Sequence, residues 1–431
     1  MNKNSFAPTP PMGWNSWDCY GAAVTEEQLL ANADYVSKNL KQHGYEYVVC
    51  DIQWYEPTAK SNEYNPFADL SMDKYSRLIP AVNRFPSSKG GKGFKPIADK
   101  IHAMGLKFGI HIMRGIPRQA VHKNTAILGS DKTARQIAKQ YSVCPWNTDM
   151  YGVNPKAEGA REYYQSIFDL YASWGVDFIK CDDICNTEFN KENPYSAKDE
   201  IELIRSCLDN IDREIVLSLS PGPAQIEYAE HLSRNANMWR LTGDFWDNWD
   251  KLKAMFERTS KWYPYVKEGC WPDCDMLPLG RLAKNASYEG GKDRYTLFTS
   301  DEQITLMNLW CIFRSPLMLG GELNDNNDWD LWLITNDEVL SANINGNNPR
   351  PLVYDENEAV WLSDGDGCKY LALFNLSDEE RAVSVETAKT EIEHPFVRDL
   401  WEHRDLGTVK KKIKVSLRPH ASVMYKLTLA K

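Results

Sequence analysis

The sequence contains no apolar run of the roughly 18 residues that a membrane-spanning helix needs. Residues 1–11 also lack a hydrophobic core of signal-peptide length. Basic residues are not in excess, because 50 Lys and Arg stand against 60 Asp and Glu, for a net charge of −10. This acidic balance disfavours nucleic acid and anionic membrane surfaces as partners. We therefore expect a cytoplasmic protein, or else a processed mature form, that binds a neutral small molecule.

The ten cysteines lack the spacing of a metal site or of a disulfide framework. Most lie in strand-like or helix-like segments, which predicts buried thiols in a reducing compartment. Cys270 and Cys274 flank three residues, but no second close Cys or His pair completes a zinc site. We therefore expect no metal and no other cofactor. Cys144 and Cys185 border loops expected near the functional site, so a disulfide between them stays open.

Three strand-like apolar stretches close on acidic residues, where a buried strand should exclude charge. They are residues 45–51, ending at Asp51; residues 176–183, which contain Asp182 and Asp183; and residues 238–244, ending at Asp244. In a (β/α)8 barrel the C-terminal ends of the strands line the active site. Asp51, Asp182 and Asp244 are therefore candidates for catalysis, whereas Asp183 is expected to be structural.

Strand-like and helix-like segments alternate along the first three quarters of the chain. Thr25 and Gln28 predict the start of the helix after the first strand, and Trp246 is expected on the helix that follows residue 244. Five further strand-like stretches bring the count to eight, at residues 10–17, 106–112, 215–220, 269–275 and 316–320. From about residue 343 the pattern changes to short alternating strands broken by turns. The sequence therefore predicts an α/β fold, a (β/α)8 TIM barrel over residues 1–342, followed by a C-terminal antiparallel β-sandwich over residues 343–431. Residues 113–155 are too long for a connector and should cover the site.

Five motifs stand at the predicted strand ends, in this order: Met12-Gly13-Trp14-Asn15-Ser16-Trp17, Lys180-Cys181-Asp182, Arg240-Leu241-Thr242-Gly243-Asp244, Trp271-Pro272-Asp273-Cys274-Asp275-Met276-Leu277 and Ser315-Pro316-Leu317-Met318-Leu319-Gly320. Together they resemble glycoside hydrolase family 27, the family of α-galactosidases and α-N-acetylgalactosaminidases, and the β-rich tail resembles that family's C-terminal sandwich. The resemblance implies Asp182 as nucleophile and Asp244 as acid/base. It also implies that the sugar is contacted by Trp17, Asp51, Lys180, Arg240, Asp275 and Met276.

The chemistry of a retaining glycosidase fits these two acids. Such an enzyme needs an ionised carboxylate that attacks the anomeric carbon and a protonated acid that releases the leaving oxygen. Lys180 shares a strand face with Asp182 and would keep it anionic, whereas Asp244 would need a raised pKa. Two alternatives stay open, a buried ionic network of Asp182 and Asp244 with Lys180 and Arg240, and a structural hydrogen-bonding role for Asp51. Trp17 could likewise be a core residue.

Three positions that differ from the usual α-galactosidase pattern bear on the choice of sugar. Galactosidases usually have two adjacent acids after the second strand, whereas here Ile52 follows Asp51. An apolar side chain there would leave a C6 hydroxyl without a hydrogen-bond partner. β-L-Arabinopyranose is α-D-galactose without the C6 hydroxymethyl group. At this position the chain therefore resembles the arabinopyranosidase branch of the family. His111 replaces a Tyr and could contact the sugar or cap the strand. Ser220 stands where acetylgalactosaminidases have Ser, which keeps that activity as an alternative.

The sequence thus predicts an exo-acting retaining glycoside hydrolase for a small oligosaccharide or glycoside, favouring β-L-arabinopyranosides over α-D-galactosides. Two other classes stay open. A non-catalytic sugar-binding protein would not need both Asp182 and Asp244, and a metal-dependent barrel lyase or isomerase would use its strand-end acids as ligands. The sequence does not decide the oligomeric state and leaves a homo-oligomer open.

Overall fold

The computed structural model describes residues 2–288 and 290–429 and contains a parallel eight-stranded sheet. Its hydrogen-bonded order is β10-β9-β8-β7-β3-β2-β1-β13. The strands are β1 (Met12–Asn15), β2 (Tyr47–Cys50), β3 (Lys107–Met113), β7 (Phe178–Asp182), β8 (Val216–Leu219), β9 (Met238–Arg240), β10 (Trp271–Asp273) and β13 (Leu317–Leu319). Each falls in a stretch that the sequence marks as a strand, so the predicted barrel is confirmed.

The barrel closes just beyond the end of β10. The backbone N–H of Leu277 donates to the carbonyl of Met318 at 2.8 Å, and the N–H of Gly320 donates to the carbonyl of Leu277 at 3.0 Å. Inside the barrel, apolar side chains fill the space between the strands, and Phe6 and Ala7 pack against them near the strands' N-terminal ends. The interior is therefore a packed core, and in this fold the C-terminal end of the strands is where a ligand binds.

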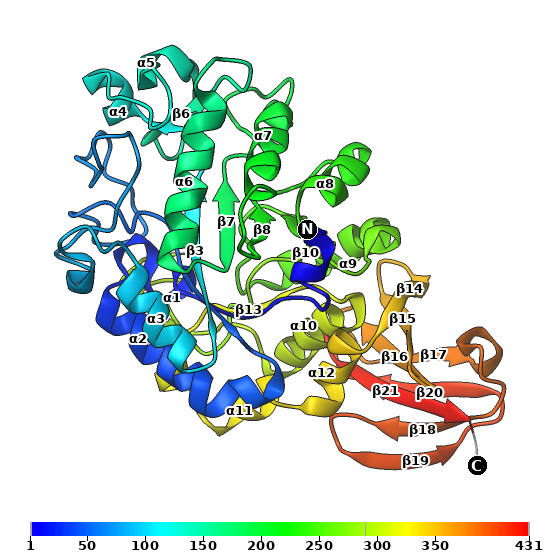
Figure 1. Cartoon of the computed structure of the whole chain (residues 1–431). Coiled ribbons are helices and arrows are strands. Elements are labelled where there is room, and N and C mark those ends of the chain that lie inside the picture. Colours follow the sequence, from blue (N-terminus) through cyan, green and yellow to red (C-terminus); the bar gives the residue numbers. More distant parts are fainter. Residues whose placement is uncertain (1, 289, 430–431) are drawn as a thin grey trace.

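Helices surround the sheet (Figure 1). The longer ones are α2 (Glu26–Tyr35), α3 (Lys95–Ala103), α6 (Ala160–Trp174), α7 (Lys198–Leu208), α8 (Ala229–Asn235), α9 (Trp249–Trp262), α10 (Ser300–Phe313), α11 (Asp328–Ile334) and α12 (Asp337–Ile344). Helix α2 begins at the expected capping box, in which Thr25 and Gln28 satisfy each other's backbone N–H groups. The chain then runs through a π turn and a 3-10 turn to Gly44, whose φ of 100° ends the helical segment.

Residues 113–155 are not an irregular loop. They form β4 (Ile116–Pro117), α4 (Arg118–Lys123), α5 (Ala134–Ile137), β5 (Ala138–Val143) and β6 (Met150–Val153), and the strands pair as an antiparallel sheet in the order β4-β6-β5. Two of these strands are too short or too polar to be recognised from alternation alone. A short hairpin of β11 (Arg281–Leu282) and β12 (Arg294–Tyr295) projects later in the chain.

The C-terminal part is the expected antiparallel β-sandwich, drawn in orange and red in Figure 1. One sheet has the order β14 (Asn347–Tyr354), β15 (Glu358–Gly365), β16 (Cys368–Asn375), β21 (Ser422–Leu429), β18 (Pro395–Asp399) and β19 (Arg404–Thr408), and the other pairs β17 (Arg381–Glu386) with β20 (Lys412–Leu417). Helix α10 joins the two domains, since Thr305 and Asn308 each donate to the Ser422 hydroxyl at 2.8 Å.

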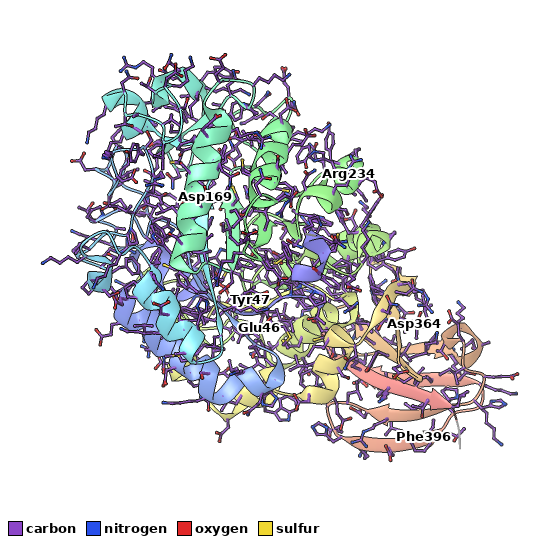
Figure 2. All side chains as sticks on the ribbon, in the orientation of Figure 1. Glu46, Tyr47, Asp169, Arg234, Asp364 and Phe396 are labelled. Carbon is purple, nitrogen blue, oxygen red and sulfur yellow. The ribbon has the colours of Figure 1, made fainter. Side chains whose placement is uncertain are left out.

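A charged cluster at the opposite end of the barrel makes ordinary structural contacts. Glu46 and Tyr47, labelled in Figure 2, lie at the start of β2, where the Lys107 ammonium donates to the Glu46 carboxylate at 2.7 Å and to the Tyr47 hydroxyl at 3.4 Å. All ten cysteines are described and are buried free thiols, so Cys144 and Cys185 are not joined. Within residues 2–288 and 290–429, no helix has the length and apolarity to cross a membrane.

The closeness of β1 and β2 gives a test of the barrel. A Cβ on Gly13 would lie 2.2 Å from the carbonyl oxygen of Tyr47, a backbone atom that cannot move without separating the strands. We expect Gly13→Ala to lower the free energy of unfolding by about 1–3 kcal/mol, seen as a lower urea midpoint. Gly243→Ala is the control, because no heavy atom lies within 4 Å of the position that its Cβ would take. Equal midpoints for the two variants would contradict this close packing.

Candidate active site

A cavity of about 450 Å³ lies at the C-terminal ends of the barrel strands. Most of the residues singled out in the sequence line it, namely Trp17, Asp51, His111, Lys180, Asp182, Arg240, Asp244, Asp275 and Met276. They come from the ends of six different strands and the loops that follow them. The parallel barrel brings them together because it places all strand C-termini at one end.

His111 connects two of the buried carboxylates. It lies on β3, whose register places it opposite Lys180 and places Met113 opposite Asp182 on β7. Its Nδ1 lies within hydrogen-bonding distance of Asp51 Oδ1, at 2.7 Å, and its Nε2 lies 2.9 Å from Asp182 Oδ2. The sequence offered two roles for this residue, sugar contact and strand cap. The structure adds a third, a bridge between two acids.

The charged residues of this cluster shift one another's pKa values. Burial is the largest influence on His111 and would lower its pKa, but the charge of Asp51 together with the contacts to Asp182 and Asp51 outweighs it, so the pKa lies above its usual value. Burial alone would raise the pKa of Asp182, but the contact with His111, its charge and then that of Lys180 hold the pKa below the usual value. Both shifts favour the ionised form of Asp182 and the positively charged form of His111.

Lys180 acts on this cluster mainly through Asp51. Its Nζ lies 3.5 Å from Asp51 Oδ2, and Asn15 donates to the same oxygen at 2.8 Å. The backbone N–H of Ile52 donates to Asp51 Oδ1, also at 2.8 Å. Asp51 thus has the structural hydrogen bonds of the alternative interpretation, although it also lines the cavity. Lys180 reinforces the negative charge of Asp182 from a distance, whereas His111 touches it.

Asp244 lies in a contrasting environment. Strand β9 ends at Arg240, so the stretch expected as one strand to residue 244 is shorter, and Asp244 stands on the loop beyond it. Its side chain is 65% exposed and lies 3.2 Å from the Arg240 guanidinium, which also contacts Asp275 at 2.9 Å. The two acids proposed from the sequence therefore differ, since Asp182 is buried beside His111 and Asp244 is open to solvent.

Asp275 completes the polar wall near Arg240. It accepts a hydrogen bond from the backbone N–H of Phe245 at 2.9 Å, which anchors the loop that carries Asp244. Burial raises the pKa of Asp275 despite the neighbouring Arg240. Asp183 turns away from the cavity and pairs with Arg114 at 2.8 Å, and burial raises its pKa to about 7. Asp183 is thus structural, as the sequence suggested.

Two of the expected site residues do not line the cavity. Ile52 and Ser220 are both fully buried. Ile52 follows Asp51 in the turn after β2, and its side chain joins the main hydrophobic core. The Ser220 hydroxyl has no hydrogen-bond partner among the described residues, while its backbone carbonyl accepts from Ile184 and Cys185.

The cavity also contains residues that the sequence did not single out. These are chiefly Asp18, Tyr64, Trp146, Trp246 and Tyr288. Asp18 directly follows Trp17 and could have been found from the same motif. The three aromatic residues at 64, 146 and 288 lie on long connections with no local periodicity. Trp246 was expected on a helix, but α9 begins only at Trp249, so Trp246 belongs to the loop beside Asp244.

A (β/α)8 barrel with acids at its strand ends and a C-terminal β-sandwich is the architecture of a class of glycoside hydrolases. Comparison with known families agrees. The family model for alpha-galactosidase A matches residues 152–345, and that for the alpha-galactosidase C-terminal β-sandwich domain matches residues 356–427. The chain belongs to glycoside hydrolase family 27 and is a glycosidase. This excludes the sugar-binding protein and the metal-dependent lyase as classes.

Solved structures and curated proteins extend this similarity over the whole chain. A family 27 β-L-arabinopyranosidase from Geobacillus stearothermophilus is 55% identical, with a TM-score of 0.98 and full coverage of both chains. A putative α-N-acetylgalactosaminidase from Bacillus halodurans is 50% identical, with a TM-score of 0.88 and coverage of 98% and 97%. Alpha-galactosidase 2 of Arabidopsis thaliana is 26% identical over 438 residues, covering 100% of this chain and 92% of its own.

The bridge formed by His111 leads to a stability prediction. Replacing His111 by Phe leaves Asp51 and Asp182 without the cation between them, and an uncompensated buried charge costs about 3–5 kcal/mol. We expect a large loss of thermal stability in His111→Phe. His43→Phe is the control, because His43 forms an ion pair with the exposed Asp337 and such a surface pair is worth about 0–1 kcal/mol.

The difference in melting temperature between wild type and His111→Phe should depend on pH. The pKa of folded His111 is raised, so its stabilisation is complete below its unfolded value of about 6.5 and is lost as pH rises through the folded value. The pKa of Asp182 is lowered, so its share is present above about 3.9 and is lost as pH falls through the folded value. The gap in melting temperature between wild type and His111→Phe should therefore be widest between about pH 4 and 6.5. A gap that grew into the alkaline range would contradict the bridge.

Proposed function

We propose that this glycosidase is an exo-acting, retaining enzyme that releases terminal β-L-arabinopyranosyl units. Asp182 is the nucleophile and Asp244 the acid/base. The observation that carries the proposal is the pairing, in one cavity, of a buried aspartate ionised beside His111 with a solvent-open aspartate on a loop. The packed barrel interior closes the cavity at its inner end, which favours cleavage of a terminal sugar.

In the first step, a carboxylate oxygen of Asp182 attacks the anomeric carbon while the bond to the leaving oxygen breaks. Asp244 donates its proton to that oxygen, and a covalent sugar ester on Asp182 remains. In the second step, Asp244 takes a proton from water, and the hydroxide oxygen attacks the anomeric carbon and releases Asp182. The two inversions return the sugar with its original configuration. His111 and Lys180 keep Asp182 ionised between turnovers.

The sugar preference rests on two observations. The 55% identical relative is a β-L-arabinopyranosidase. The residue after Asp51 is Ile52, so the turn beyond β2 has no second carboxylate that could accept a hydrogen bond from a C6 hydroxyl. A sugar without that group, such as β-L-arabinopyranose, has no C6 hydroxyl that would need such a partner. We therefore expect Ile52 to favour the arabinopyranoside because it offers no hydrogen-bond acceptor to a C6 hydroxyl.

The preference can be measured with nitrophenyl glycosides of β-L-arabinopyranose, α-D-galactose and N-acetyl-α-D-galactosamine. We expect kcat/KM to be about tenfold higher or more for the arabinopyranoside, the size of discrimination that one small group allows. Ile52→Asp should move the ratio toward the galactoside, with Ile52→Val as the apolar control. A wild-type preference for galactoside or for N-acetylgalactosaminide would reject the proposed specificity.

The proposed roles of the two acids can be separated with azide. Asp182→Gly should lose activity by about 10⁴-fold or more, and azide should restore turnover with the inverted α-L-arabinopyranosyl azide as product. Asp244→Ala should lose about 10²–10⁴-fold with poor leaving groups, and azide should give the retained β-L-azide. Asp366→Gly, on an exposed turn of the sandwich, is the control. Identical azide products from the two site variants would refute the assignment.

A further inference from the structure

Five aromatic rings form a continuous arc around the cavity. Neighbouring ring centroids are 5.8 Å apart for Trp146 and Tyr64, 6.0 Å for Tyr64 and Trp17, 6.1 Å for Trp17 and Tyr288, and 4.2 Å for Tyr288 and Trp246. All five line the cavity, although they come from segments far apart in the sequence. The proposed mechanism uses none of these rings, and the family resemblance implies a sugar contact only for Trp17, so the rest of the arc has no role yet.

The part of the arc formed by Tyr288 and Trp246 lies beside the proposed acid/base. Trp246 is two residues after Asp244 and is almost buried. Tyr288 is half-buried and lies between Trp246 and Trp17, with its ring tilted by 31° to that of Trp246. A general acid must contact the oxygen of the leaving group. Asp244 and both rings line one cavity, so we expect a group attached to that oxygen to lie near these two rings.

The position of the Tyr288 ring is held by its surroundings. Its hydroxyl donates to the carbonyl of Trp17 at 3.1 Å, so the hydroxyl is already engaged and the ring face is what remains for a ligand. Asn62 holds the neighbouring Ser287, since its amide accepts from the Ser287 N–H at 3.1 Å and donates to the Ser287 carbonyl at 3.2 Å. The ring is thus positioned before any ligand arrives, which lowers the entropy cost of binding.

An ion pair joins the two loops that carry these rings. Arg294, at the end of the hairpin, donates to both oxygens of Asp247, at 2.5 and 2.9 Å, and Asp247 directly follows Trp246. The backbone N–H of Leu297 donates to the same carboxylate at 2.6 Å. Asp244, Trp246 and Tyr288 are therefore held as one unit, and a leaving group that contacts the rings also aligns its oxygen with the acid.

We propose that Tyr288, backed by Trp246, is the platform of a leaving-group subsite for a rigid ring with a flat apolar face. Both an aryl group and a second sugar have such a face. This inference rests on the proposed function, because it assigns the leaving-group side of the same cavity. It predicts selectivity for what is attached to the terminal sugar, in addition to the selectivity for that sugar.

The test compares leaving alcohols of similar acidity, so that only the ring differs. Ethyl, benzyl and 6-linked methyl glucoside derivatives of β-L-arabinopyranose would be hydrolysed by the purified full-length enzyme. We expect kcat/KM for both ring-bearing substrates to exceed that for the ethyl glycoside by about tenfold. A gain with benzyl alone indicates an aryl leaving group, and a gain with the glucoside alone indicates a sugar. Equal kcat/KM for all three would overturn the proposal.

Variants then locate the platform through the ratio of the benzyl to the ethyl kcat/KM, which does not depend on the fraction of folded enzyme. Tyr288→Leu should bring this ratio down toward one, whereas Tyr288→Phe should keep it because the ring face remains. Tyr141→Leu is the matched control, since Tyr141 is 77% exposed and lies outside this cavity. An unchanged ratio in Tyr288→Leu would overturn the assignment.

Failure of this inference and failure of the proposed function remain distinguishable. The proposed specificity fails if wild type does not hydrolyse nitrophenyl β-L-arabinopyranoside in preference to the other two sugars. The subsite fails if the benzyl to ethyl ratio of wild type is one. If wild type prefers the nitrophenyl α-D-galactoside, the benzyl to ethyl kcat/KM ratio is measured with α-D-galactosides. The subsite is therefore tested in either case.

Discussion

The contact of one histidine with two buried carboxylates is the interaction on which the site depends. His111 lies between Asp51 and Asp182, at 2.7 and 2.9 Å, in a buried position at the floor of the cavity where an unpaired charge would be costly. Lys180 adds a second positive charge beside Asp51. Without these cations, burial would protonate the acids, and the proposed nucleophile would lose its negative charge.

The barrel explains why these groups meet. Adjacent parallel strands place His111 opposite Lys180, so that the side chains of β3 and β7 point into the same end of the barrel. The packed interior below them excludes water from one side and fixes their positions. Asp244 lies beyond the end of its strand and remains open to solvent. The side chains of Asp182 and Asp244 are chemically identical but lie in different environments. A mechanism with a nucleophile and a separate acid requires such a difference.

The loops add a second level of organisation above the strand ends. Hydrogen bonds from Asn62 and an ion pair between Asp247 and Arg294 tie the hairpin of Tyr288 to loops that begin in other parts of the barrel. These contacts assemble aromatic rings from distant segments into one wall. In barrel enzymes the strands supply a stable frame, and the loops define which molecules fit. The arc of rings in this chain is consistent with that division.

The sequence by itself determined the number and order of the barrel strands, the cap at Thr25, the change to a β-sandwich and the acids at the strand ends. These features follow from local periodicity and from charge placed where burial forbids it, both of which can be read within a short window of sequence. The sheet within residues 113–155 and the loop position of Trp246 could not be read in this way, because their strands are short and their contacts distant. The role of His111, the burial of Ile52 and the arc of aromatic rings were decided only by the tertiary structure. Each depends on side chains from distant parts of the sequence meeting at one end of the barrel, and no local pattern records such distances.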